Sequence, residues 1–262
     1  MSTPLPALFV SHGSPMLALE DGPARRFLTG LAADLPRPKA ILVVSAHWET
    51  RTPVVSAASA PETIHDFGRG FPKALFAIRY SAPGAPELAA RTAELLTAAG
   101  LPVSVHPDRG LDHGAWVPLG LAWPDADVPM TQLSIQPHLG PEWHRRLGEA
   151  LRPLREEGVL IVASGALTHN LGEFFGRDLD AEAPDWVVAF GNWMHGAVTE
   201  GRADEALDYR SRAPHAARNH PTEEHLLPLF VAMGAGTPGA AGRRLHSSHT
   251  YGVLAMDAYA FD

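Results

Sequence analysis

The sequence is rich in histidine, the side chain that most often binds divalent metals in proteins. It has 14 histidines among 262 residues and no cysteine. His12, His47 and His169 each follow a strongly apolar segment and are flanked by small or turn-forming residues. Because no thiolate is present, a metal would be bound through nitrogen and oxygen. Such a ligand set suits zinc, iron, copper or nickel.

The segments before these histidines have the composition of buried strands. Ala7–Ser11, Ala40–Ala46 and Val159–Ala163 are short, nearly continuous apolar runs, typical of strands covered on both faces. Further strands are predicted at Val103–His106, Met130–Ile135 and within Arg243–Phe261, and helices at 22–33, 86–99, 141–157, 184–199, 203–212 and 222–233. The alternation predicts an α/β fold with a central, mostly parallel or mixed sheet covered by helices on both faces.

In such a sheet, ligands bind at the carboxyl ends of the strands. His12, His47 and His169 would therefore project from one edge of the sheet. We expect His113 in a loop after the 103–106 strand and His225 in the first turn of the 222–233 helix. The five histidines could share one crevice and hold a metal. The alternative for each is an ordinary loop histidine bonded to the backbone.

Motifs of other enzyme classes are missing. The sequence has no HExxH motif. His220 and His225 flank Pro-Thr-Glu-Glu, and Pro221 disfavours a continuous helix through both. It has neither a phosphate-binding loop followed by lysine nor a GxGxxG motif opening a helix. The GxSxG nucleophile elbow is also absent.

The composition excludes several functional classes. The chain is 45% hydrophobic and 19% charged, as in ordinary globular proteins. Its net charge of −8 gives no electrostatic footprint for nucleic acid or anionic membranes. No apolar run reaches the roughly 18–20 residues of a membrane span. The first residues lack the features of a secretory signal, so we expect a cytoplasmic protein with one domain over residues 1–262.

Six short motifs, in order along the chain, give a family resemblance. They are His12-Gly13-Ser14-Pro15, Ser45-Ala46-His47-Trp48, Thr63-Ile64-His65-Asp66-Phe67-Gly68, Leu111-Asp112-His113-Gly114-Ala115-Trp116, Ser164-Gly165 with Thr168-His169-Asn170-Leu171, and Pro221-Thr222-Glu223-Glu224-His225. With these motifs the chain closely resembles the DODA-type extradiol aromatic ring-opening dioxygenases, class III enzymes similar to DOPA 4,5-dioxygenases. The resemblance implies a single α/β catalytic domain.

The resemblance also implies roles for the histidines. His12, His47 and His225 look like the metal ligands. His169 looks like the acid/base residue beside the metal, with the alternative of a fourth ligand. His113 looks like a second catalytic histidine, which contacts a substrate hydroxyl or bound oxygen.

The implied reaction is cleavage of a catechol ring by O₂. Iron(II) is expected in catalysis, and zinc could occupy the same site because three neutral imidazoles with an open position also suit zinc. His65, Trp48, Trp116 and Phe67 are candidates for binding the aromatic diol. For these four side chains, ordinary core or loop packing is an equally good interpretation.

Two rival functions remain open at this stage. One is a zinc hydrolase on the same fold, and the other is a non-catalytic metal-binding protein. A wider group of extradiol enzymes often has a carboxylate as third ligand, where this chain has His225 beside Glu223 and Glu224. The sequence therefore does not choose between iron and zinc, nor between a monomer and a small homo-oligomer.

Overall fold

The protein is built around a large mixed sheet. The computed structural model describes residues 4–262, so Met1 to Thr3, part of the segment used above to exclude a secretory signal, lie outside it. The sheet has the strand order β4-β3-β5-β2-β6-β1-β10-β7. Its strands are β1 (Ala7–Ser11), β2 (Ala40–Glu49), β3 (Val54–Ser56), β4 (Ser104–His106), β5 (Met130–Ile135), β6 (Val159–Gly165), β7 (Arg243–His246) and β10 (Ala258–Phe261).

The central strands β5, β2, β6 and β1 run parallel, and β10 pairs antiparallel with β1. The predicted mostly parallel or mixed sheet is therefore confirmed. Near the C-terminus, β8 (His249–Thr250) and β9 (Leu254–Ala255) form a separate small hairpin.

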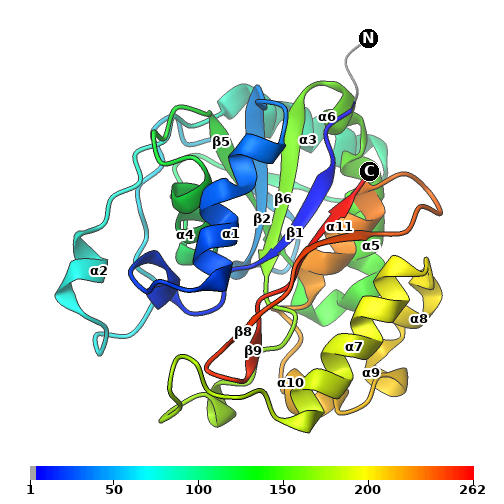
Figure 1. Cartoon of the computed structure of the whole chain (residues 1–262). Helices are drawn as coiled ribbons and strands as arrows, with labels where there is room; N and C mark the ends of the chain where they lie inside the picture. Colours follow the sequence, from blue (N-terminus) through cyan, green and yellow to red (C-terminus); the bar gives the residue numbers. More distant parts are fainter. Residues whose placement is uncertain (1–3) are drawn as a thin grey trace.

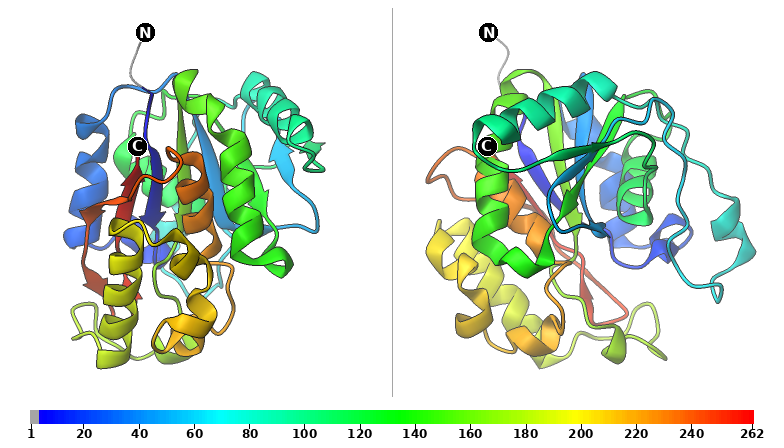
Figure 2. Two further views of the ribbon diagram at one scale, coloured as in Figure 1. Left: turned by 90° about the vertical axis from the view of Figure 1, so that its right-hand side faces the viewer. Right: turned by 180° about the vertical axis from the view of Figure 1, so that it is seen from behind.

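Helices cover both faces of this sheet (Figure 1). Helices α1 and α4 lie on one face, and α3, α5 and α11 lie on the other, as the edge-on view in the left panel of Figure 2 shows. The helices are α1 (Pro23–Leu31), α2 (Lys73–Ala77), α3 (Pro86–Ala98), α4 (His113–Ala122), α5 (Gly140–Leu151), α6 (Pro153–Glu156), α7 (Asp185–Thr199), α8 (Ala203–Leu207), α9 (Tyr209–Arg212), α10 (Ala216–Asn219) and α11 (Leu227–Ala235).

The alternation of side chains along each strand divides the core into two layers. In β1, Ala7 and Phe9 belong to the layer under α5 and α11, whereas Leu8 and Val10 belong to the layer under α1 and α4. All four side chains are buried. Burial on both faces explains why β1, β2 and β6 contain nearly continuous apolar runs in the sequence.

Two expectations about histidine positions were wrong. His113 begins helix α4 rather than lying in a loop, and Asp112 caps this helix by accepting a hydrogen bond from the Ala115 amide. His225 lies in a turn before a helix, because α11 begins at Leu227 with Pro228 in its first turn. Proline has no amide hydrogen and disfavours helical backbone in the residue before it, so helices tend to start at proline.

The described helices of the protein are shorter or more polar than a membrane span. None of those within residues 4–262 is both long and apolar enough to cross a bilayer.

Candidate active site

The carboxyl ends of the parallel strands bring His12, His47 and His225 together. His12 follows the last residue of β1, and His47 lies near the end of β2. The Nε2 atoms of His12 and His47 are 2.9 Å apart, and those of His225 and His47 are 3.3 Å apart. Nitrogens bound to one metal at about 2.0–2.1 Å are separated by roughly 2.8–3.4 Å, from right-angle to tetrahedral arrangements, so this spacing fits a shared ion.

The outer nitrogens of these rings face hydrogen-bond acceptors. His12 Nδ1 is 2.9 Å from Ser164 Oγ, whose own hydrogen is donated to the Gly114 carbonyl. His225 Nδ1 is 2.9 Å from the Glu224 carboxylate. Each Nδ1 must therefore carry the hydrogen, which leaves the Nε2 lone pair directed toward the other histidines. Lone pairs converging in this way repel one another unless a cation lies among them.

His225 is held at the sheet edge by its own backbone. The Ala166 amide, just after β6, donates a 2.9 Å hydrogen bond to the His225 carbonyl. That carbonyl packs against Gly165, where a Cβ atom would overlap it. Glycine at this position thus allows the His225 turn to approach the end of β6 closely.

Burial keeps the three histidines neutral. It lowers the pKa of His47 to about 3. Burial is also the main cause that lowers the pKa values of His12 and His225 well below the usual range, and repulsion from the neighbouring histidines adds to it. Metal ligands must be deprotonated, so the site is set up to bind a cation at neutral pH.

His113 is oriented by Asp66. One Asp66 oxygen accepts hydrogen bonds from the His113 amide at 2.9 Å and from the His113 Nδ1 at 3.0 Å. Burial raises the pKa of Asp66, but these bonds outweigh it and bring the pKa to about 2. The other Asp66 oxygen is 3.7 Å from His47 Nδ1. One ionised carboxylate therefore fixes His113 and faces a candidate ligand.

A glycine lets helix α4 reach the histidines. A Cβ atom on Gly114 would lie 3.0 Å from His47 Cδ2 and 3.1 Å from His12 Cε1. It would also overlap the Ser45 hydroxyl, which donates a 2.7 Å hydrogen bond to Asp112. Only a residue without a side chain fits here unless the site shifts.

A second set of donors lies around the same point. The nitrogens of His12, His47 and His113 are all within 4.8 Å of one another, and so are the donor atoms of His169, Glu224 and His225. His47 links the two sets, because its Nε2 atom lies 2.9 Å from that of His12 and 3.3 Å from that of His225. This link makes His12, His47 and His225 the candidate ligands.

A cavity of about 770 Å³ opens at this site. Of the sequence-predicted residues, His47, His113, His169, His225 and Phe67 line it. As far as residues 4–262 define the lining, Trp48, Trp116 and His65 are not part of it. Trp48 is buried beneath the Arg109 guanidinium, Trp116 donates a hydrogen bond to the Ile64 carbonyl, and His65 contacts the Ile78 carbonyl. Packing is the better interpretation for these three side chains.

Several functional partners were missed in the sequence. Ser164, Asp66 and Glu224 each hold a site histidine by its outer nitrogen. Asp66 and Ser164 are 47 and 152 residues from the histidines that they contact. Glu224 directly precedes His225, so a carboxylate next to a candidate ligand was the one local signal available.

The fold and the site together define a class of protein. A histidine-lined metal site at the carboxyl edge of an α/β sheet, open to a cavity, is typical of a mononuclear metalloenzyme with free coordination positions. Residues 6–261 match the family model described as the catalytic LigB subunit of aromatic ring-opening dioxygenase. The chain belongs to this family.

The relatives narrow the assignment further. A 4,5-DOPA dioxygenase extradiol from Beta vulgaris is 45% identical over 257 residues, which cover 97% of this chain and 95% of the relative. One from Escherichia coli strain K12 is 44% identical, covering 89% and 86%. The crystal structure of an uncharacterized Escherichia coli K12 protein matches with a TM-score of 0.80 and 35% identity, over 98% of this chain and all of the other.

These matches confirm the predicted family and activity. The protein is an extradiol ring-cleaving dioxygenase that uses a metal and O₂ on an aromatic substrate. Neither the zinc hydrolase nor the non-catalytic metal-binding protein is favoured.

Proposed function

We propose that residues 1–262 act as one catalytic domain in which His12, His47 and His225 hold a single iron(II) ion. The convergence of three Nε2 atoms, 2.9 and 3.3 Å apart, is the observation that supports this ligand set most directly. When bound, iron(II) supplies Lewis acidity toward the catechol hydroxyls and the redox chemistry that O₂ requires. Zinc fits the same nitrogens but has no redox chemistry, so we assign it to an inactive form.

His169 is the proposed base for a catechol hydroxyl. It lines the cavity, and burial lowers its pKa to about 4, so its ring is neutral at pH 7 and has a lone pair to accept a proton. Its ring stacks on that of His225, which supports a role beside the proposed metal ligands. The proton accepted there is available for return to an oxygen later in the reaction.

His113 is the proposed group for orienting and stabilising the reacting oxygens. Asp66 accepts the hydrogen on Nδ1, which leaves Nε2 as the atom that faces substrate. When Nε2 is protonated, the carboxylate of Asp66 stabilises the imidazolium, and Nε2–H can donate to an oxygen on which negative charge develops.

The proposed substrate is a catechol with a side chain, as in DOPA. The relatives named above carry DOPA in their names. A volume of about 770 Å³ is ample for a substituted ring. Phe67, Phe71 and Phe174 line the cavity and offer apolar surfaces for the ring and its substituent.

Metal reconstitution tests this proposal. The protein as purified would be analysed for metals, stripped, and reloaded anaerobically with iron(II) or with zinc(II). We expect oxygen uptake and a yellow ring-fission product with L-DOPA only in the iron-loaded sample. No uptake across a panel of catechols with stoichiometric iron bound would contradict it.

A further inference from the structure

The turn of the C-terminal hairpin touches a segment that lines the active-site cavity. We call this segment, residues 170–183 between β6 and α7, the strap. Tyr251 follows β8 and donates a 2.9 Å hydrogen bond from its amide to the Leu179 carbonyl of the strap. Its ring packs edge-on against Phe174, with centroids 4.6 Å apart. A hydrogen bond and an aromatic contact thus join Tyr251 to both halves of the strap.

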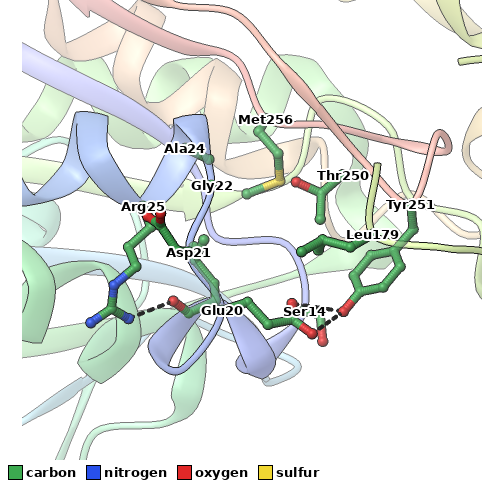
Figure 3. A pocket seen from close by; sticks show the side chains of 11 residues that line it. Ser14, Glu20, Asp21, Gly22, Ala24, Arg25, Leu179, Thr250, Tyr251 and Met256 are labelled. Carbon is green, nitrogen blue, oxygen red and sulfur yellow. Dashed lines mark hydrogen bonds between the residues drawn. The ribbon is translucent and has the colours of Figure 1, made fainter. Parts of the chain in front are cut away.

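The phenol of Tyr251 is fixed from a third direction. Its Oη lies 2.6 and 2.7 Å from the two oxygens of Glu20, in the loop that follows His12, and donates to that carboxylate (Figure 3). Ser14 of this loop lines both the small pocket around Tyr251 and the active-site cavity. The pair therefore ties the strap to the loop that directly follows His12, a candidate metal ligand.

The backbone of Tyr251 adopts a conformation that non-glycine residues rarely use. Its φ is +55°, and Gly252 follows with φ +68°. A Cβ atom on Gly252 would press on the Glu182 carbonyl at the far end of the strap. A strained backbone of this kind persists only where its surroundings determine it, and such residues gather at functional sites.

The strap supplies an aromatic wall to the cavity. Leu171, Phe174 and Phe175 all line it, and Phe175 is 78% exposed. An exposed phenylalanine at a cavity mouth has few protein contacts to fix it, so its place depends on what holds the strap. Glu173 of the strap also pairs with Arg218, and Phe174 packs against the Trp186 cluster. The contacts of Tyr251 are the ones that connect the strap to the loop after His12.

We propose that Tyr251, fixed by Glu20, is a positioning residue that holds Phe174 and Phe175 against the ring substituent of the catechol. The pair thereby sets which substituents bind well. This inference rests on the proposed function, since it concerns the substrate of the same site. It assigns the strap to recognition of the part of the substrate remote from the metal.

Substrate comparison tests this role. In iron-loaded Tyr251→Phe we expect the KM for L-DOPA to rise about tenfold, since a hydrogen bond to a charged group is lost. The kcat for L-DOPA and both constants for unsubstituted catechol stay unchanged, because catechol has no substituent to reach the wall. Glu20→Gln has the same effect, and the double variant adds nothing further. Tyr80→Phe, which loses a phenol hydrogen bond to the Trp123 carbonyl away from the cavity, behaves as wild type.

Proteolysis gives a readout that does not depend on turnover. Arg177 lies in the strap, so trypsin should cleave after it faster in metal-free Tyr251→Phe and Glu20→Gln than in wild type or Tyr80→Phe. Unchanged cleavage, or an equal loss of activity toward both substrates, would overturn the inference. If the wild type turns over no catechol, the proposed function fails instead, and the cleavage rates still decide whether Tyr251 positions the strap.

Discussion

The imidazole ring of His169 lies flat against that of His225, with ring centroids 3.4 Å apart and planes 11° from parallel. Imidazole binds metals through lone pairs that lie in the plane of the ring. The lone pairs of two parallel rings run side by side and do not converge on one point. This stacking favours His169 as a base beside the metal rather than as a fourth ligand.

Replacement of His169 should therefore separate turnover from metal binding. We expect His169→Ala to retain the metal while kcat falls by about 10² to 10⁴, the usual contribution of a general base. His169→Phe keeps a ring to stack on His225 but should be equally inactive. Metal content by elemental analysis and oxygen uptake measure the two effects. His12→Ala, as the comparison, should lose the metal itself; an equal metal loss in His169→Ala would make His169 a ligand.

The hydrogen bond from His225 to Glu224 gives a second prediction. In Glu224→Gln the acceptor becomes neutral, so Nε2 of His225 is a weaker ligand. Loss of such an outer partner typically weakens metal binding by about 10- to 100-fold. Competition with a chromophoric chelator measures the metal affinity. Glu223→Gln is the matched control, since Glu223 accepts a hydrogen bond from Tyr209 instead; equal affinities in the two variants would contradict this role for Glu224.

The close approach of helix α4 to His12 and His47 gives a third prediction. Gly114→Ala places a methyl group against His12 and His47, and overpacking costs about 1–3 kcal/mol. Alanine also stabilises a helix by about 1 kcal/mol relative to glycine, which offsets part of this cost in the free energy of unfolding. Nothing offsets the displacement of the histidines, so we expect the loss in metal affinity to be the larger effect. Gly120→Ala, in the same helix, meets only Tyr80 at an ordinary 3.4 Å and should leave metal affinity unchanged. Metal titration of both variants measures the affinity. An unchanged affinity in Gly114→Ala would show that the helix can move away from the histidines.

A core histidine outside the site predicts a pH dependence of stability. His144 is fully buried, contacts the Gly140 carbonyl through Nδ1 and accepts from the Gln136 amide through Nε2. Burial lowers its pKa from 6.5 to about 4. The unfolded chain then binds more protons between these values, so this contribution to stability is present above pH 6.5. It is lost as the pH falls toward 4, by at most about 3 kcal/mol.

Urea unfolding of the metal-free protein at several pH values measures this effect. The variant His144→Gln keeps a donor and an acceptor but does not titrate. Its free energy of unfolding should fall less steeply than that of wild type between pH 6.5 and 4. Parallel curves for the two proteins would show that His144 contributes nothing to the acid sensitivity.

The sequence predicted the strands best. The predicted bounds of β1 and β5 match the structure. Strand β1 is buried on two faces and is an almost continuous apolar run, whereas β5 is equally buried but has polar residues at three of its six positions. Helix α4 was missed for a related reason. It is buried almost all around and contains Pro118 and two glycines, so it shows no amphipathic period and resembles a loop.

The histidines of the candidate site could be grouped from the sequence, but the residues that hold them could not. Histidines that follow parallel strands share an edge by topology alone, so His12, His47 and His169 could be grouped in advance. The pairing of Asp66 with His113 depends on how a long loop folds back onto α4, for which no local pattern exists. The same holds for the aromatic residues. Their aromatic side chains suggested Trp48 and Trp116 for substrate binding, whereas strand alternation and helix packing direct both side chains toward the core.

The placement of β1 between β6 and β10 has a consequence for biosynthesis. The strand leading to His12 is synthesised well before residues 258–261, which form one of its two neighbours. His225 is also synthesised long after His12. Pairings so distant in sequence form slowly and need both partners to have left the ribosome. We therefore expect the site to acquire its metal only after β10 has been synthesised.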